Sequence, residues 1–183
     1  MCASDVVPDL PEPDTIVLED GTTVVIRPIR PDDAAYLKST FPRLSAQSIY
    51  FRFMTYKREL TDEEARRFAN VDYVTQMAFV ALCEEDGEEV VAGVARYALL
   101  DTAQPGIAEA AVIVGDEYQG RGIGKILLDR LLKYARQRGL RALRGNLLLE
   151  NDRMMGMVAR SGLPYQKRYA EGYWEVTVDL SGI

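Results

Sequence analysis

The sequence contains no histidine in its 183 residues, and this absence excludes several kinds of catalysis. Ser-His-Asp and Cys-His nucleophilic sites, and general-base chemistry by imidazole, all require that side chain. Zinc sites that use histidine ligands are excluded for the same reason. Any proton transfer must therefore use carboxylates, tyrosine, lysine, cysteine or water, and no metal is expected.

Cysteine and long apolar runs are also scarce. The two cysteines are Cys2, near the start of the chain, and Cys83, inside an apolar run, so we expect no disulfide between them. No stretch approaches the roughly 18 apolar residues of a membrane span, and the N-terminus lacks the basic and apolar segments of a signal peptide. These absences favour a cytoplasmic protein without a membrane partner.

Positive charge is in deficit. The 22 lysines and arginines are outnumbered by 28 aspartates and glutamates, which gives a formal net charge of −6. This balance disfavours nucleic acid as a partner, because nonspecific binding to nucleic acid requires a basic face. Length and composition predict one globular domain over residues 15–183, after a flexible leader at residues 1–14 that contains prolines and aspartates without periodicity.

Apolar periodicity and turn residues predict a mixed order of strands and helices. The expected strands are residues 16–18, 22–29, 77–83, 90–100, 107–114, 142–149, 165–170 and 173–179. The expected helices are residues 31–41, a segment capped by Ser45, residues 61–70, 122–138 and 151–160. We therefore expect an α/β (α+β) fold in which hairpins pair antiparallel and residues 107–149 form a right-handed parallel crossover.

The segment Tyr118–Lys125, which reads Tyr-Gln-Gly-Arg-Gly-Ile-Gly-Lys, connects a strand to the best-defined helix. Successive backbone N–H groups and the helix dipole converge there, which is typical of a diphosphate site. A Walker A loop is excluded because Gly120 is one residue too close to Gly124 and no hydroxyl residue follows Lys125. A dinucleotide fingerprint is disfavoured because Leu127 occupies its third glycine position.

Gln119, Gly122 and Gly124 match the pattern Gln/Arg-x-x-Gly-x-Gly/Ala, and with this pattern the chain resembles the GNAT superfamily of acyl-CoA-dependent N-acyltransferases. The resemblance covers Thr15 to Asp179. It implies a GNAT-like, mostly antiparallel sheet with a parallel β-α-β splay that holds the acyl-CoA. The alternative is a glycine-rich helix start with a purely structural role.

Other stretches are similar to the acetyltransferase domain of bacterial protein-lysine acetyltransferases. These stretches are residues 20–33, 48–53 and 70–73. The resemblance implies acetyl-CoA as cosubstrate, bound by Val112, Ile113, Val114, Gln119, Gly120, Arg121, Gly122, Ile123, Gly124, Lys125 and Asn151. As alternatives, the residues of the strand are only sheet core and Asn151 is only a helix cap.

Glu109 is the position at which the resemblance implies a general base. Among Ile107, Ala110 and Val112 we expect its carboxylate to be partly desolvated, which would raise its pKa toward a useful range. The alternative is an exposed strand residue without a catalytic role. Many relatives place a tyrosine as general acid where this chain has Val158, so no acid is predicted.

The resemblance thus implies an N-acetyltransferase that moves an acetyl group to a primary amine by direct attack. Whether the amine belongs to a protein lysine or to a small molecule is left open, as is a homodimer. A noncatalytic acyl-CoA-binding sensor is the alternative from another functional class.

Overall fold

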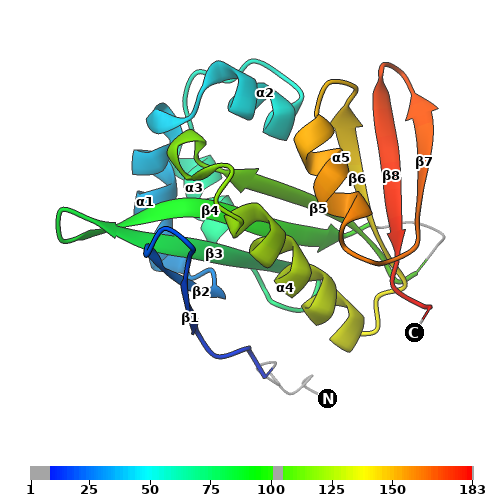
Figure 1. Cartoon of the computed structure of the whole chain (residues 1–183), viewed down its shortest axis with the longest axis horizontal. Helices are drawn as coiled ribbons and strands as arrows, with labels where there is room; N and C mark the ends of the chain where they lie inside the picture. Colours follow the sequence, from blue (N-terminus) through cyan, green and yellow to red (C-terminus); the bar gives the residue numbers. More distant parts are fainter. Residues whose placement is uncertain (1–8, 101–104, 183) are drawn as a thin grey trace.

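The computed structural model describes residues 9–100 and 105–182, and an eight-stranded sheet organises them (Figure 1). The sheet order is β1-β2-β3-β4-β5-β6-β8-β7. The strands are β1 (Asp14–Val17), β2 (Thr23–Pro28), β3 (Gln76–Glu85), β4 (Glu88–Leu99), β5 (Ile107–Val114), β6 (Ala142–Leu148), β7 (Tyr165–Ala170) and β8 (Tyr173–Asp179). The pair β5 and β6 is parallel, and the other neighbours are antiparallel. The predicted α/β class and mostly antiparallel sheet are confirmed.

The helices lie where the capping patterns place them, with one difference. They are α1 (Ala34–Thr40), α2 (Ala46–Phe53), α3 (Asp62–Ala69), α4 (Ile123–Gln137) and α5 (Asp152–Ala159). The Ser45 side chain accepts a hydrogen bond from the Ser48 N–H and begins α2. The helix predicted from Pro31 begins instead as a 3₁₀ turn, because the Asp33 carboxylate accepts from the Arg30 N–H at 2.7 Å and closes a tighter turn first.

The start of the chain differs slightly from the prediction. The strand β1 begins at Asp14, the last residue of the predicted leader, and residues 9–13 form no helix or strand. Cys2 and the first eight residues lie outside the described part of the chain.

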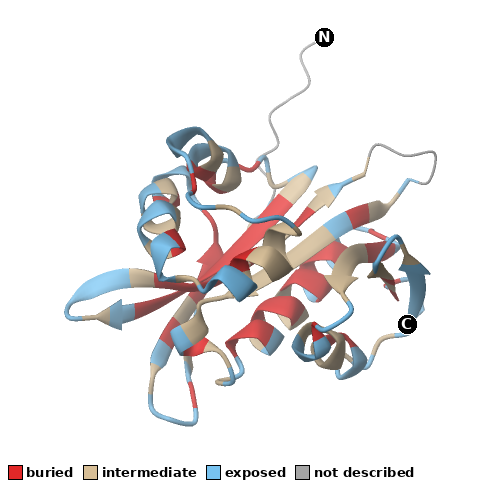
Figure 2. Ribbon diagram, turned by 90° about the horizontal axis from the view of Figure 1, so that it is seen from above, coloured by how far each residue is buried: buried red, intermediate tan, exposed pale blue. Residues whose placement is uncertain are grey.

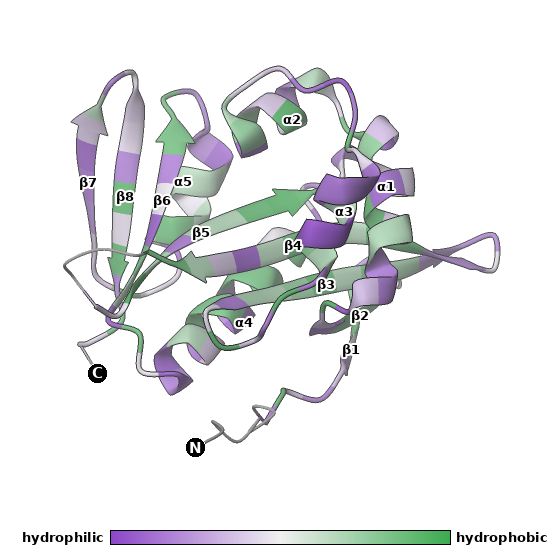
Figure 3. Cartoon of the chain, turned by 180° about the vertical axis from the view of Figure 1, so that it is seen from behind, coloured by the Kyte–Doolittle hydropathy of each residue, from purple (hydrophilic) through white to green (hydrophobic). Residues whose placement is uncertain are grey.

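Helices cover both faces of the sheet. The helix α4 packs on one face, against β3 and β4, and α1 and α3 lie over the opposite face (Figures 1 and 3). Buried residues concentrate along the central strands and on the inner side of α4 (Figure 2). Leu127, Leu131 and Ala135 are fully buried at helical spacing, so the apolar periodicity that predicted this helix marks its core face.

The strands β5 and β6 pair over only three residues. The paired positions are Ile107 with Ala142, Ala108 with Leu143, and Glu109 with Arg144. Beyond Glu109, β5 continues along β4 to Val114, and β6 continues along β8. The two strands therefore separate after Glu109 (Figure 1), and backbone groups of residues 110–114 that face β6 have no strand partner.

Candidate functional site

A cavity of about 730 Å³ occupies the region where β5 and β6 separate. One wall is the strand segment Ala110–Val114, and the other contains residues of β6 and α5. The glycine turn before α4 closes one end, and residues of α2 lie on the remaining side. The parted strands and the helix N-terminus thus border one continuous cavity.

The glycine turn presents an unusually open row of hydrogen-bond donors. Gly120 and Gly122 have φ angles of +77° and +90°, and a Cβ at either would meet no heavy atom within 4 Å. No backbone N–H from Gly120 to Lys125 donates a hydrogen bond to another described residue. Because unpaired N–H groups at a helix N-terminus attract anions, this turn fits a pyrophosphate.

Gln119 directs its side chain inward to fix the shape of this turn. Its Nε2 donates to the carbonyl oxygen of Val114 at 3.0 Å and to Ser48 Oγ at 3.1 Å. Its Oε1 accepts a hydrogen bond from Arg153 of α5. Gln119 therefore links the end of β5 to α2 and α5, and its amide is already engaged within the protein.

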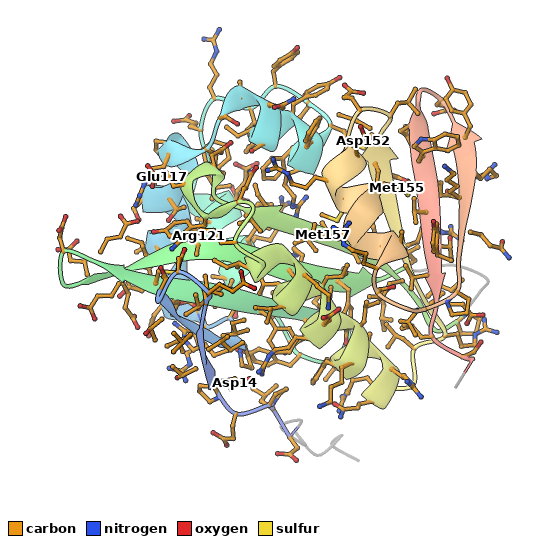
Figure 4. All side chains as sticks on the ribbon, viewed as in Figure 1. Asp14, Glu117, Arg121, Asp152, Met155 and Met157 are labelled. Carbon is orange, nitrogen blue, oxygen red and sulfur yellow. The ribbon has the colours of Figure 1, made fainter. Side chains whose placement is uncertain are left out.

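Two residues of the predicted phosphate loop have side chains that do not line the cavity. Arg121 forms an ion pair with Asp20 at 2.6 Å and lies beside the β1–β2 turn (Figure 4). The hydrogen bond from Arg121 lowers the pKa of Asp20 well below its usual range. Ile123 is 1% exposed and belongs to the core. Both residues can contact a bound anion only through their backbone N–H groups.

Lys125 and Gly124 do line the cavity. Lys125 is half exposed and also pairs with Asp129 one helical turn later. A Cβ at Gly124 would lie 3.0 Å from the sulfur of Met157, so this glycine permits α5 to pack closely against α4 (Figure 4). No pattern in the sequence indicates that Met157 would contribute to the wall.

The β5 residues and Asn151 border the middle of the cavity. Val112 and Val114 pack against the main core, Ile113 points to the opposite face, and all three line the cavity. Asn151 is 9% exposed, and its Oδ1 caps α5 by accepting from the Met154 N–H at 3.2 Å. Its Nδ2 donates to no described residue, so the cap leaves this donor available to a ligand.

Glu109 is the last residue of β5 that pairs with β6, next to the first cavity residue Ala110. Its side chain is exposed, so the partial desolvation expected from its apolar neighbours is not found. The reason is that side chains alternate along a strand, so Ala110 and Val112 pack against the core on the opposite face from Glu109. Burial lowers the pKa of the Arg52 guanidinium on α2, and attraction to Glu109 partly offsets this effect.

Other candidate acids and nucleophiles are engaged elsewhere. Asp72 accepts hydrogen bonds from the N–H groups of residues 74, 75 and 76, and Glu117 pairs with Arg43. Tyr118 is the tyrosine in the cavity wall, but its hydroxyl donates to Glu85. Burial raises the pKa of the Cys83 thiol, which keeps it un-ionised.

Val158, at the position where relatives carry a tyrosine, is 6% exposed and lines the cavity without a polar atom. Within residues 9–100 and 105–182, no group of three or more acidic or cysteine side chains is placed to hold a metal ion. Over the same residues, none of the helices has the length and apolar character needed to cross a membrane.

Comparison with known proteins agrees with this geometry. The model of the acetyltransferase (GNAT) family matches residues 44–163. Acetyltransferase PA5475 of Pseudomonas aeruginosa is 38% identical over 124 residues, which cover 68% of this chain and 66% of that protein. Acetyltransferase Pat of Mycolicibacterium smegmatis is 28% identical over 150 residues, which cover 82% of this chain and 44% of that protein.

A solved structure extends the similarity to the whole fold. The crystal structure of the GNAT domain of S. lividans PAT is 29% identical, covers 91% of this chain and 96% of that chain, and has a TM-score of 0.80. The chain thus spans about two thirds of PA5475 and less than half of the mycobacterial Pat. The resemblance drawn from Gln119, Gly122 and Gly124 is confirmed, and the chain belongs to the acetyltransferase (GNAT) family of acyl-CoA-dependent N-acyltransferases.

Proposed function

We propose that this protein transfers the acetyl group of acetyl-CoA to a primary amine, and that the acceptor is a protein lysine. The observation that carries the proposal is the row of unpaired N–H groups from Gly120 to Lys125 beside the parted strands. A diphosphate at the turn and an extended chain along the free edge of β5 would use both features. The resemblance of residues 20–33, 48–53 and 70–73 to protein-lysine acetyltransferases supports lysine as the acceptor.

The residues divide into donors for the cosubstrate and one candidate base. Backbone N–H groups of residues 120–125 would hold the pyrophosphate, with Lys125 adding positive charge. The free edge of residues 112–114 and the Nδ2 of Asn151 would hold the pantetheine arm. Acetyl-CoA supplies an activated acyl group as a thioester. A backbone N–H on the free edge near Ile113 would donate to the carbonyl oxygen as negative charge develops there.

Glu109 would remove the proton that the acceptor must lose. An alkyl amine with a pKa of about 10.4 is almost wholly protonated at neutral pH, so attack requires a route for that proton. Glu109 stands where the strands part, and its exposed carboxylate can act directly or through one water molecule. The carbon–sulfur bond then breaks and coenzyme A leaves as the thiolate, which takes a proton from water, since Val158 has no proton to give.

The test is the Glu109→Gln variant, which keeps the shape and removes the base. Turnover is expected to fall about 10²- to 10⁴-fold while acetyl-CoA binding is retained. The rate should recover as the pH rises, because solvent then delivers more free amine. The control is Glu88→Gln, another exposed strand glutamate, on β4. Undiminished turnover of Glu109→Gln with an unchanged pH profile would contradict the assignment.

A noncatalytic acyl-CoA sensor is the second candidate, and the observation that favours it is the apolar Val158 in place of a tyrosine. The sensor would be established if the protein binds acetyl-CoA tightly and mass spectrometry detects no acetylated product with proteins, amino acids, polyamines or aminoglycosides as acceptors. Steady CoA release with an acetylated amine would exclude it.

A further inference from the structure

The face of the sheet that carries Glu109 is rich in arginine. Residues paired across neighbouring strands point to the same face. Glu109 is paired with Ala98 on β4 and with Arg144 on β6, and Arg96 lies two residues before Ala98. Arg96 and Arg144 therefore share the face of Glu109. The helix α2 packs over β5 and adds Arg52, which is close enough to Glu109 for the two charges to interact.

These arginines are partly buried and poorly compensated. Within the described residues, none of Arg52, Arg96 and Arg144 forms an ion pair. The Nε of Arg144 is buried without a hydrogen-bond acceptor. Burial, with repulsion from Arg52, lowers the pKa of Arg96 to about 10. A protein with a formal charge of −6 thus concentrates unpaired positive charge beside its candidate base.

The arginines also line two neighbouring cavities. Arg52 and Arg144 line the main cavity, and Arg52 and Arg96 line a smaller one of about 80 Å³. The two cavities share Arg52 and Ile113 in their walls, so the smaller one adjoins the main cavity at these residues. Its small volume excludes a nucleotide, and its two arginines are the charged residues in a lining that is otherwise mostly apolar.

Aromatic rings beside the smaller cavity contact the guanidinium groups of both of its arginines. Arg96 stacks over the ring of Phe68 with 4.9 Å to the centroid and donates to Gln76 Oε1 at 3.2 Å. Arg52 lies 4.8 Å from the ring centroid of Phe53 and donates no hydrogen bond to a described residue. Arg52 therefore keeps its planar set of donors for a ligand, and guanidinium binds carboxylates in pairs of parallel hydrogen bonds.

We propose that Arg52, supported by Arg96, binds a carboxylate that the acceptor carries close to its reacting amine. This inference rests on the proposed N-acetyltransferase function and names its substrate class. The carboxylate can come from an acidic residue beside a lysine or from an amino acid's own carboxyl group. In either case it brings the negative charge that the arginines lack and places the amine next to Glu109.

The experiment compares acceptors that carry this carboxylate with matched acceptors that lack it. One pair is a peptide with a single lysine followed by glutamate and the same peptide with glutamine, and the other is a free amino acid and its amide. The acid is expected to exceed its amide about 10- to 100-fold in kcat/KM, the range for hydrogen bonds to a charged group. The pair with the larger ratio identifies the source of the carboxylate.

Arg52→Gln should bring this ratio close to one. Arg52→Lys retains the charge and should keep part of the preference. The control is Arg58→Gln, an exposed arginine outside both cavities, which should leave the ratio as in the unaltered protein. A ratio near one in the unaltered protein, or a ratio unaffected by Arg52→Gln, would overturn the inference.

Binding separates this inference from the function on which it rests. If no acceptor is acetylated, the proposed function fails, and calorimetry of the paired peptides on CoA-saturated protein then decides the inference. Tighter binding of the glutamate peptide, lost in Arg52→Gln and at high salt, would support a carboxylate site. Equal binding of the two peptides would overturn it.

Discussion

The glycine turn permits a test that separates strain from loss of the ligand. Gly122 has a φ of +90° and faces open space. Gly122→Val should cost about 1–2 kcal/mol of folding free energy, because left-handed backbone is unfavourable for residues with a Cβ. At about 2–4 °C per kcal/mol for a chain of this size, Tm should fall by about 2–8 °C. The valine side chain would also occupy the space in front of the N–H groups.

The binding effect should be much larger than the strain. If the diphosphate loses two charge-assisted hydrogen bonds of about 1.5–3 kcal/mol each, affinity for CoA falls roughly 10²- to 10⁴-fold. Gly139→Val is the matched control, since Gly139 has a φ of +77° and open space around it, at the far end of α4. Calorimetric titration measures the affinity of each variant for CoA. A folded Gly122→Val protein that binds CoA as tightly as Gly139→Val would refute the site.

Three further variants test other parts of the molecule. Asp33→Asn removes the charge of one partner in the buried ion pair that Asp33 forms with Arg27 at 2.7 Å. Chemical denaturation should show a loss of about 3–5 kcal/mol in the free energy of unfolding. The control Asp32→Asn, at an exposed residue, should have little effect. Arg121→Ala should leave the affinity for CoA and its salt dependence unchanged in titrations at two ionic strengths, because its guanidinium pairs with the β1–β2 turn; a salt-dependent loss would show that Arg121 reaches the ligand. Burial alone would raise the pKa of Asp116, but hydrogen bonds from two serines at the start of α2 lower it. The ionised carboxylate therefore stabilises the fold above the unfolded pKa of about 3.9, and this stabilisation is lost as the pH falls through the lower folded pKa. Asp116→Asn should therefore lower Tm at neutral pH and differ less from the unaltered protein in acid, and an equal difference at every pH would contradict this linkage.

The order of elements could be predicted because each one has a local signal. Thr61 and Glu64 form the reciprocal capping box that their spacing predicts, and Asp86-Gly87 supplies the two positive φ angles of the β3–β4 turn. The first helix was predicted to begin too early because the Asp33 carboxylate accepts from the Arg30 N–H in a 3₁₀ turn. Asp33 also pairs with Arg27 of the preceding strand, and helical periodicity carries no information about a contact between two elements.

The two halves of the candidate site also differ in how far the sequence predicts them. The anion-binding half is made of backbone within one short segment, so the glycines of residues 120–124 are sufficient to predict it. The proposed acceptor half draws on four different elements: strand pairing brings Arg96, Glu109 and Arg144 to one face, and the packing of α2 on β5 adds Arg52. The strand pattern predicted partial burial for Glu109 because it does not show which face is covered. The same pairing that leaves this carboxylate exposed puts arginines around it. The positive charge of these arginines should attract an acidic acceptor to the side of the sheet that carries Glu109.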